Sequence, residues 1–105
     1  MNIKKTQNDG DVTLALSGRL DSVTQSELTQ ELEKVFETKI TSLTLELSEL
    51  EYLSSAGLRV FLFAKKKVIE MGGKMKLVGA NESINEILQI TGYANITVMR
   101  KRGAR

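Results

Sequence analysis

The stretch EYLSSAGLRVFLF, Glu51 to Phe63, decides how the rest of the sequence is interpreted. A segment flanked by apolar residues leads into two serines, and then Ala-Gly and a dense apolar run follow. This order predicts that an extended segment gives way to a helix at Ser54 and Ser55. A serine just before a helix commonly accepts a hydrogen bond from a free backbone N–H of the first turn. The serines can therefore be explained as a helix cap alone.

A second role for the serines rests on the same geometry. Free N–H groups and about half a positive charge gather at a helix N-terminus, which favours anions. A phosphate on a serine there would add about −1.5 to −2 charges and three acceptor oxygens without opposing the helix. Gly57 leaves the first turn without a side chain, so we expect room for a partner protein or a nucleotide phosphate to approach. Both the cap and the switch stay open on these grounds.

Strand and helix patterns alternate on both sides of this stretch. Val12, Leu14 and Leu16 alternate with polar or small residues, and NDGD just before them signals a tight turn. Strands are predicted at 3–7, 11–18, 42–48, 74–79 and 95–99, and helices within 20–38, 55–71 and 81–92. The order β-β-α-β-α-β-α-β predicts helical crossovers and a largely parallel sheet, with the first hairpin at one edge.

The helix ends and inward faces follow from the same patterns. Asp21 and Ser22 are predicted to cap the first helix, Gly72-Gly73 to end the second, and Asn81 and Gly92 to bound the third. The residues expected to face inward are Leu28, Leu32, Val35 and Phe36 in the first helix, and Ile84, Ile87, Leu88 and Thr91 in the third.

Composition narrows the possible functions. The 105 residues fit one domain, and a hydrophobic fraction of 41% is enough for one core. The chain has no cysteine and no histidine, so we expect no metal site and no cofactor, and catalysis would depend on carboxylates, lysines or hydroxyls. The net charge of +2 lies largely in the tail at 100–105, which we expect to be disordered, so no nucleic-acid partner is predicted. No signal peptide or membrane span is evident, which indicates the cytoplasm.

Two longer stretches resemble a known family. LELSELEYLSSAGLRVFL resembles the central motif of STAS domains of anti-sigma-factor antagonists, and SGRLDSVTQSEL resembles the family's Gly-x-Leu-Asp-x-x-Thr-x-x-x-Leu stretch. GGKMKLVGANESINEILQITG is similar to the strand and helix that follow. The resemblance covers nearly the whole chain and implies a single STAS domain at 1–99, with an open, mostly parallel sheet and helices.

The resemblance also implies a function. In that family an anti-sigma factor that is a serine kinase phosphorylates a serine at the start of the second helix, which breaks their complex, and a serine phosphatase resets the switch. The family's phosphorylated serine falls on Ser55, its preceding Asp on Ser54, its next hydroxyl on Ala56 and its Gly on Gly57. Asp21 and Thr24 match residues near the switch. We expect a protein that is monomeric in isolation.

Departures from the family pattern keep alternatives open. Ser54 replaces an acid, which removes a negative charge and makes Ser54 a second possible acceptor. Only KRGAR follows the last strand, so the family's terminal helix is short or missing. STAS domains also serve as accessory subunits of transporter or lipid-trafficking complexes, in which the serine need not be modified. An enzyme is not expected, because the chain lacks His, Cys and a Gly-x-x-x-x-Gly-Lys-Ser/Thr loop.

Two residues carry competing interpretations. Asp21 either caps the first helix only or also acts near the switch. On the second helix, Leu58, Phe61, Leu62, Val68 and Ile69 share one broad apolar face, whereas Phe63 falls on the polar side. Phe63 is expected either to pack under a neighbouring helix or loop, or to be an exposed anchor for the partner beside Ser55 and Arg59.

Overall fold

Strands and helices alternate in the predicted order in a computed structural model that describes residues 1–90 and 97–100, with side chains for residues 1–89. The strands are β1 (Asn2–Asn8), β2 (Asp11–Leu20), β3 (Ser42–Leu53), β4 (Lys74–Ala80) and β5 (Thr97–Arg100). The helices are α1 (Gln25–Val35), α2 (Ser55–Glu70) and α3 (Glu82–Ile90). The predictions for Thr91, Gly92 and most of the basic tail fall outside the described residues.

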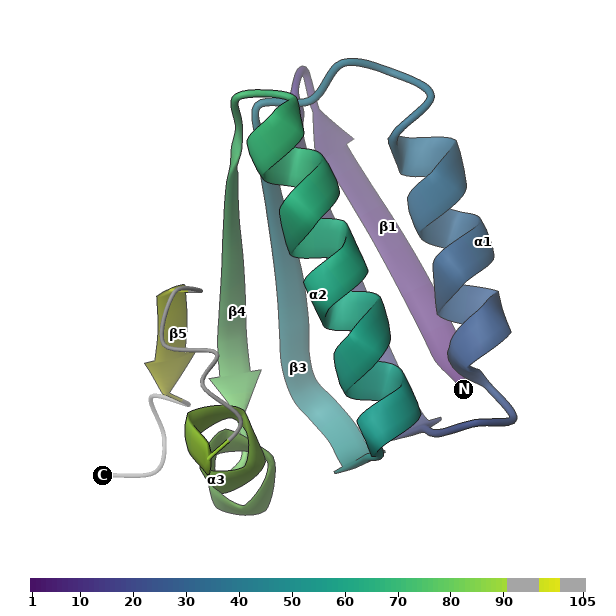
Figure 1. The fold of residues 1–105 in the computed structure, drawn as a ribbon, viewed down its shortest axis with the longest axis vertical. Helices are drawn as coiled ribbons and strands as arrows, with labels where there is room; N and C mark the ends of the chain where they lie inside the picture. The colour runs from purple at the N-terminus through teal and green to yellow at the C-terminus, as the bar shows by residue number, and fades with distance from the viewer. Residues whose placement is uncertain (91–96, 101–105) are drawn as a thin grey trace.

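All five strands belong to one sheet, in the order β1-β2-β3-β4-β5. β1 and β2 form an antiparallel hairpin, and the other three strand pairs are parallel. Crossovers between parallel strands are almost always right-handed, and the strand order advances in one direction. α1 and α2 therefore lie on the same face of the sheet, as Figure 1 shows. The predicted fold, an open and mostly parallel sheet with a hairpin edge and three helices, is confirmed.

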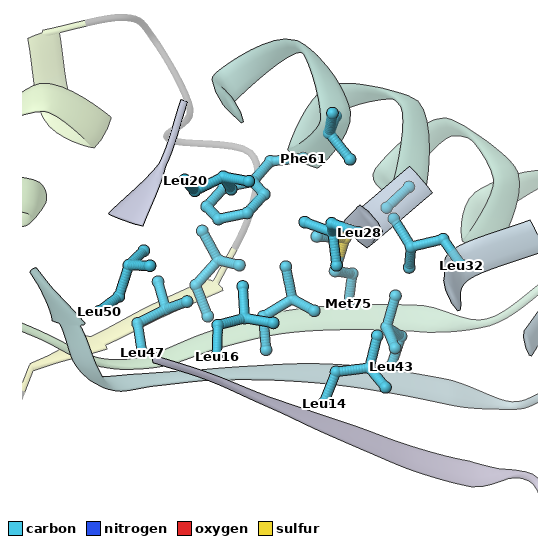
Figure 2. Packing of buried hydrophobic residues seen from close by; sticks show 14 of the residues in the cluster. Leu14, Leu16, Leu20, Leu28, Leu32, Leu43, Leu47, Leu50, Phe61 and Met75 are labelled. Carbon is cyan, nitrogen blue, oxygen red and sulfur yellow. The ribbon is translucent and has the colours of Figure 1, made fainter. Parts of the chain in front are cut away.

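The hydrophobic core lies between the sheet and this helix layer (Figure 2). Alternate residues of β2 and β3, such as Leu14 and Leu45, point into it and are fully buried. Leu28 of α1 and Phe61 of α2 meet them from the helix side and are also fully buried. The predicted inward faces are largely confirmed. Leu28, Leu32, Val35, Ile84 and Leu88 are buried, while Phe36 and Ile87 are partly buried.

β3 is longer than the sequence pattern predicted. The alternation ends near Ser48, but the strand continues to Leu53. Its pairing with β2 shifts register twice, between Ala15 and Ser17 and between Gly18 and Arg19, and at each shift β3 contains one extra residue. Bulges of this kind reset which face a side chain occupies. Buried residues therefore occur three apart at the end of β3, at Leu47, Leu50 and Leu53.

Both ends of α2 and the start of α3 match their predicted signals. α2 begins at Ser55, and its chain reverses at Gly72, whose φ of 80° is in the left-handed region that suits glycine. The Asn81 side-chain oxygen accepts a hydrogen bond from the Ile84 N–H at 2.8 Å, so Asn81 caps α3 as predicted. α2 and α3 therefore start directly after β3 and β4.

Candidate functional site

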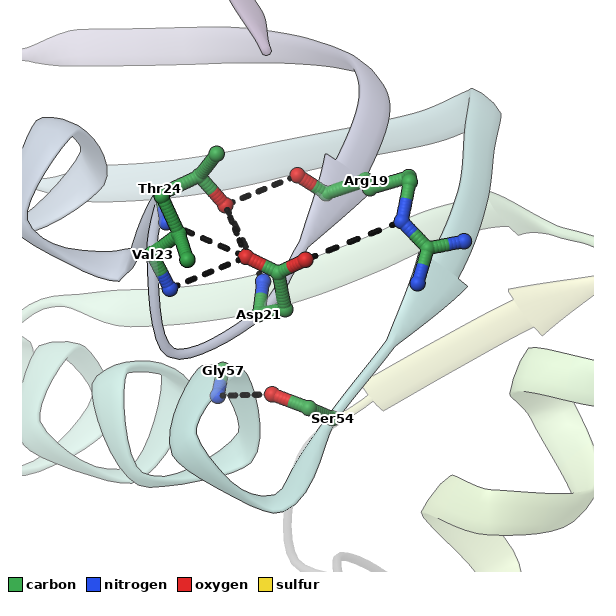
Figure 3. Close-up of polar contacts among 6 residues, drawn as sticks. All are labelled: Arg19, Asp21, Val23, Thr24, Ser54 and Gly57. Atoms are coloured by element: carbon green, nitrogen blue, oxygen red, sulfur yellow. Dashed lines mark hydrogen bonds and ion pairs between the residues drawn. The ribbon is translucent and has the colours of Figure 1, made fainter.

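The candidate site lies where β2 and β3 end and α1 and α2 begin (Figure 3). Parallel strands place their carboxyl ends at one edge of a sheet, which is where ligands usually bind in open α/β folds. The Ser54 N–H donates a hydrogen bond to the Leu20 carbonyl at 2.9 Å. This bond holds the start of α2 directly beside the turn that contains Asp21 and Thr24.

Ser54 and Ser55 occupy different positions at the start of α2. Ser54 has an extended backbone, and its Oγ accepts a hydrogen bond from the Gly57 N–H at 3.3 Å, so it is the N-cap. Its side chain is half-buried, whereas Ser55, the first residue of the helix, is exposed. The first turn of α2 contains no acidic residue. An anion on Ser55 would therefore meet the positive end of the helix without a competing carboxylate in that turn.

Gly57 has a different role from the predicted one. It is buried, and a Cβ atom placed on it would lie 2.7 Å from both Leu20 Cγ and Leu53 Cδ1. Carbon atoms cannot approach that closely, so the missing side chain makes room for two core leucines. The expectation that Gly57 leaves space for an incoming partner is wrong, because the protein's own core fills that space.

Asp21 organises the turn between β2 and α1. Its Oδ1 accepts hydrogen bonds from the N–H groups of Val23 (3.0 Å) and Thr24 (3.1 Å). The Thr24 hydroxyl donates to the Arg19 carbonyl at 2.8 Å and accepts from the Asp21 N–H at 3.0 Å. The Thr24 N–H bond, helped by the Val23 N–H and the charge of Arg19, outweighs partial desolvation and lowers the pKa of Asp21 below its ordinary 3.8. Asp21 is therefore held in its ionised form.

The prediction that Asp21 and Ser22 cap α1 is wrong in position. α1 begins at Gln25, and its N-cap is Thr24, whose side chain makes no capping bond. Asp21 instead binds the turn that precedes the helix. The Gln25 N–H still donates to the Asp21 carbonyl at 2.9 Å. The aspartate thus stabilises the entry into α1 from one turn upstream.

Arg19 and Tyr52 are part of the site and were not identified from the sequence. The Arg19 guanidinium lies 4.2 Å from the centre of the Tyr52 ring, and its Nε lies 3.6 Å from Asp21 Oδ2. Arg19 and Tyr52 are partners in the β2–β3 pairing, after the second register shift. No local pattern could have found this contact, because the two bulges determine which residues face each other. Val23, 80% exposed, borders the same turn.

Phe63, on α2, packs against the residue that follows α1. Its ring meets that of Phe36, just after α1, edge to face, with ring centres 6.2 Å apart. The side chain is 36% exposed. Phe63 therefore packs against Phe36, yet it is also one of the exposed large hydrophobic side chains, so its role as an anchor for the partner stays a prediction. Arg59, one turn after Ser55, is exposed, and Ala56 is half-buried.

The broad apolar face predicted for α2 is narrower in the structure. Leu58, Phe61 and Val68 are buried, but Leu62 and Ile69 are 51% and 57% exposed. Only the sheet-facing side of α2 contributes to the core. Two large aliphatic side chains are consequently left on its solvent side.

Other parts of the described structure offer no comparable site. Among the described residues, no group of three or more acidic side chains could hold a metal ion. Nor does that part of the chain contain a helix long and apolar enough to cross a membrane. A hollow of about 360 Å³, bordered by Lys4, Ser17 and Glu46 among others, includes none of the predicted site residues. The carboxyl edge of the sheet remains the best candidate.

Comparison with known proteins agrees with this geometry. BtrV of Bordetella bronchiseptica and the anti-sigma-B factor antagonist of Bacillus subtilis are each 29% identical to this chain over 96 residues. These matches cover 91% of this chain and 83% and 87% of the two relatives. The fold matches the anti-sigma factor antagonist SpoIIAA in its unphosphorylated form, with a TM-score of 0.85, 13% identity, and coverage of 97% of this chain and 90% of that one.

The phosphorylated form of Bacillus SpoIIAA also matches, with a TM-score of 0.77, 13% identity, and coverage of 97% of this chain and 94% of that one. At this identity the two SpoIIAA structures support the fold alone. The sequence pattern of the STAS domain spans residues 2–102, nearly the whole chain. The chain therefore belongs to the STAS domain family.

Proposed function

We propose that this protein is an anti-sigma factor antagonist: a regulatory protein that binds an anti-sigma factor and is switched off by phosphorylation of Ser55. The names of its relatives support the general role. The observation that carries the switch is the exposure of Ser55 as the first residue of α2, beside the Asp21 turn. A kinase can reach this hydroxyl, and the helix can accept the added charge.

Ser54 is the less suitable acceptor of the two serines. Its hydroxyl oxygen already accepts the Gly57 N–H, and its side chain is half-buried. Phosphorylation there would disturb the bond that starts the helix, which is typically worth about 1 kcal/mol. The Ser55 hydroxyl makes no hydrogen bond with any described residue that would have to break. We therefore assign the switch to Ser55 and the cap to Ser54.

The proposed binding surface surrounds Ser55. Val23 and Tyr52 are exposed apolar or aromatic side chains near this edge of the sheet, and the Asp21 network fixes the backbone between them. A partner seated here would cover Ser55. A phosphate would then bring a doubly charged, strongly hydrated group into the interface, which costs desolvation energy and repels nearby acidic groups. A serine phosphatase would restore binding.

The test uses an anti-sigma factor that is a serine kinase, taken from the genes beside this one if such a kinase is encoded there. The chain is incubated with that kinase and ATP, and the phosphate is located by mass spectrometry of the intact chain and of its peptides. We expect one phosphate on Ser55, none on the Ser55→Ala variant, and normal modification of Ser54→Ala. We also expect Ser55→Asp to bind the partner more weakly than Ser55→Ala.

Other outcomes would change the proposal in defined ways. Phosphate found only on Ser54 would move the acceptor by one residue. Equal affinities of Ser55→Asp and Ser55→Ala would remove the switch and favour a constitutively bound subunit. Failure of the unmodified chain to bind the kinase at all would contradict the proposed role itself.

A further inference from the structure

Five residues of α2 form one exposed line along the helix. Ser55, Arg59, Leu62, Lys66 and Ile69 follow one another at spacings of four, three, four and three residues, and all five are exposed. Residues at these spacings lie on one face of a helix. We call this line the α2 seam. It is about 21 Å long at 1.5 Å per residue, and α2 lies in front of the sheet in Figure 1.

The apolar members of the α2 seam are unusual for a face that contributes nothing to the core. Leu62 is 51% exposed and Ile69 is 57% exposed. The opposite side of the helix, with Phe61, Ala64 and Val68, already provides the buried face. Single exposed apolar residues are ordinary. Two large ones, two helical turns apart and on the same line as the proposed phosphoacceptor, point to a surface that another molecule covers.

The positive charges of the seam are not in ion pairs with any residue that the structure describes. Arg59 and Lys66 lie on the seam, and Lys65 and Lys67 flank it. None of the four forms an ion pair with any described residue, since the two ion pairs found there are Arg19–Asp21 and Lys34–Glu31. Glu70 is the one acidic residue of α2. The seam therefore presents a net positive surface interrupted by two aliphatic side chains.

We propose that the α2 seam is the docking surface for the protein partner, and that the matching partner surface is acidic with two apolar recesses about 10 Å apart. This inference rests on the proposed function, and it adds the extent and the chemistry of the interface. Ser55 stands at the N-terminal end of the seam. A phosphate there would repel the acidic partner directly. It would also attract the side chain of Arg59, four residues later, and so draw that side chain away from the partner.

An acidic protein surface fits the seam better than an anionic membrane does. A helix that lies on a membrane buries a continuous apolar face rich in long or aromatic side chains. The seam offers only Leu62 and Ile69, separated by a cation, on a helix held rigidly against the sheet. The nearest aromatic side chain on this side, Phe63, is already engaged with Phe36. Separate recesses on a folded protein can accept such isolated side chains.

The experiment measures affinity for the same anti-sigma factor by calorimetry at two salt concentrations. We expect Leu62→Gln and Ile69→Gln each to weaken binding at least about fivefold, and Arg59→Glu and Lys66→Glu at least about tenfold at low salt. Melting temperatures should stay close to that of the unchanged chain, because these side chains lie outside the core. Lys5→Glu is the matched charge control, since Lys5 is exposed on β1, and we expect unchanged binding.

The outcomes separate this inference from the proposed function. If Ser55→Asp loses affinity while all four seam variants bind like the unchanged chain, the seam inference is wrong and the switch stands. If Lys5→Glu weakens binding as much as Lys66→Glu does, the effect comes from the overall charge of the protein, and the seam inference is again wrong. If phosphatidylglycerol vesicles bind the chain through Leu62 and Ile69 while the partner's affinity is unaffected, the seam is a membrane surface. Absence of binding by the unmodified chain would overturn both proposals.

Discussion

At the scale of single residues, neighbouring polar side chains have different roles at this edge of the sheet. Asp21 and Ser54 are engaged with backbone N–H groups, whereas Ser55 is left exposed. A serine that caps a helix cannot change without cost to the fold, but the serine after it can. The sequence placed both serines at the helix start correctly. The local pattern alone did not separate their roles, which the family resemblance assigned by register, because burial and hydrogen bonding distinguish the two serines only in the folded chain.

Asp21 gives a prediction about acid stability. The folded protein lowers the pKa of this carboxyl below 3.8. Its stabilising effect is therefore fully present above that ordinary value and is lost as the pH falls through the lower, folded pKa. Asp21→Asn keeps an acceptor oxygen but loses the charge. We expect this variant to be less stable than the unchanged chain at neutral pH, with a difference that shrinks as the pH falls below 3.8.

Urea unfolding at a series of pH values measures that difference. Asp9→Asn is the matched control, because Asp9 is an exposed carboxylate at the β1–β2 turn and forms no ion pair with any described residue. A constant difference between Asp21→Asn and the unchanged chain would show that the charge of Asp21 contributes nothing and that only its shape matters.

At the scale of elements, the sequence predicted what depends on local pattern and missed what depends on a neighbour. Periodicity was enough to find α2, and Gly72 was enough to find its end. The last part of β3 was missed because its bulges exist only in register with β2. The buried face of α2 is also narrower than the sequence pattern predicted, because burial depends on a neighbouring element. Leu58 and Leu62 look alike in sequence, and only the packing of α2 on the sheet buries one and exposes the other.

The contact between Phe63 and Phe36 ties α2 to the end of α1 and can be tested as a pair. Edge-to-face aromatic pairs contribute about 0.5–1.5 kcal/mol beyond the area they bury. We expect Phe63→Ala and Phe36→Ala each to lower the free energy of unfolding, and the double variant to lose less than the sum of the two. The difference should fall in that range of about 0.5–1.5 kcal/mol.

Leu62→Ala is a useful comparison for this pair. It removes a half-exposed apolar side chain from the same helix that has no aromatic partner, so its effect should add to that of Phe36→Ala. Strict additivity of the Phe63 and Phe36 variants would show that the rings touch without stabilising the fold. That result would favour Phe63 as part of the partner surface.

At the scale of the whole molecule, the core and the proposed switch are kept apart. The core lies between the sheet and the inner faces of the helices, whereas Ser55 and the α2 seam lie on the outer side. Composition, element order and the family resemblance were enough to predict this arrangement in outline. They could not predict that the outer side of α2 carries Leu62 and Ile69, because that depends on how the finished helix is rotated against the sheet.

This separation predicts that phosphorylation of Ser55 changes binding without unfolding the protein. A negative charge in the first turn of a helix stabilises it by about 0.3–1 kcal/mol. An ion pair with Arg59 at i+4 would add about 0.2–0.5 kcal/mol. We therefore expect the phosphorylated chain to be as stable as the unmodified chain or slightly more stable at low salt. Arg59→Ala should remove part of that gain, and Lys5→Ala should not.

Chemical denaturation of the purified phosphorylated and unmodified chains, at low and high salt, measures the change directly. The gain should shrink as salt screens the charges. Amide hydrogen exchange should show unchanged protection in β2, β3 and α2, because the core between them is untouched. If phosphorylation instead lowered the free energy of unfolding by more than about 1 kcal/mol, a loss as large as that of a helix cap, the switch would act by loosening the start of α2. The loss of binding at the outer surface of the helix would then follow from this loosening and would not be caused directly by the charge of the phosphate.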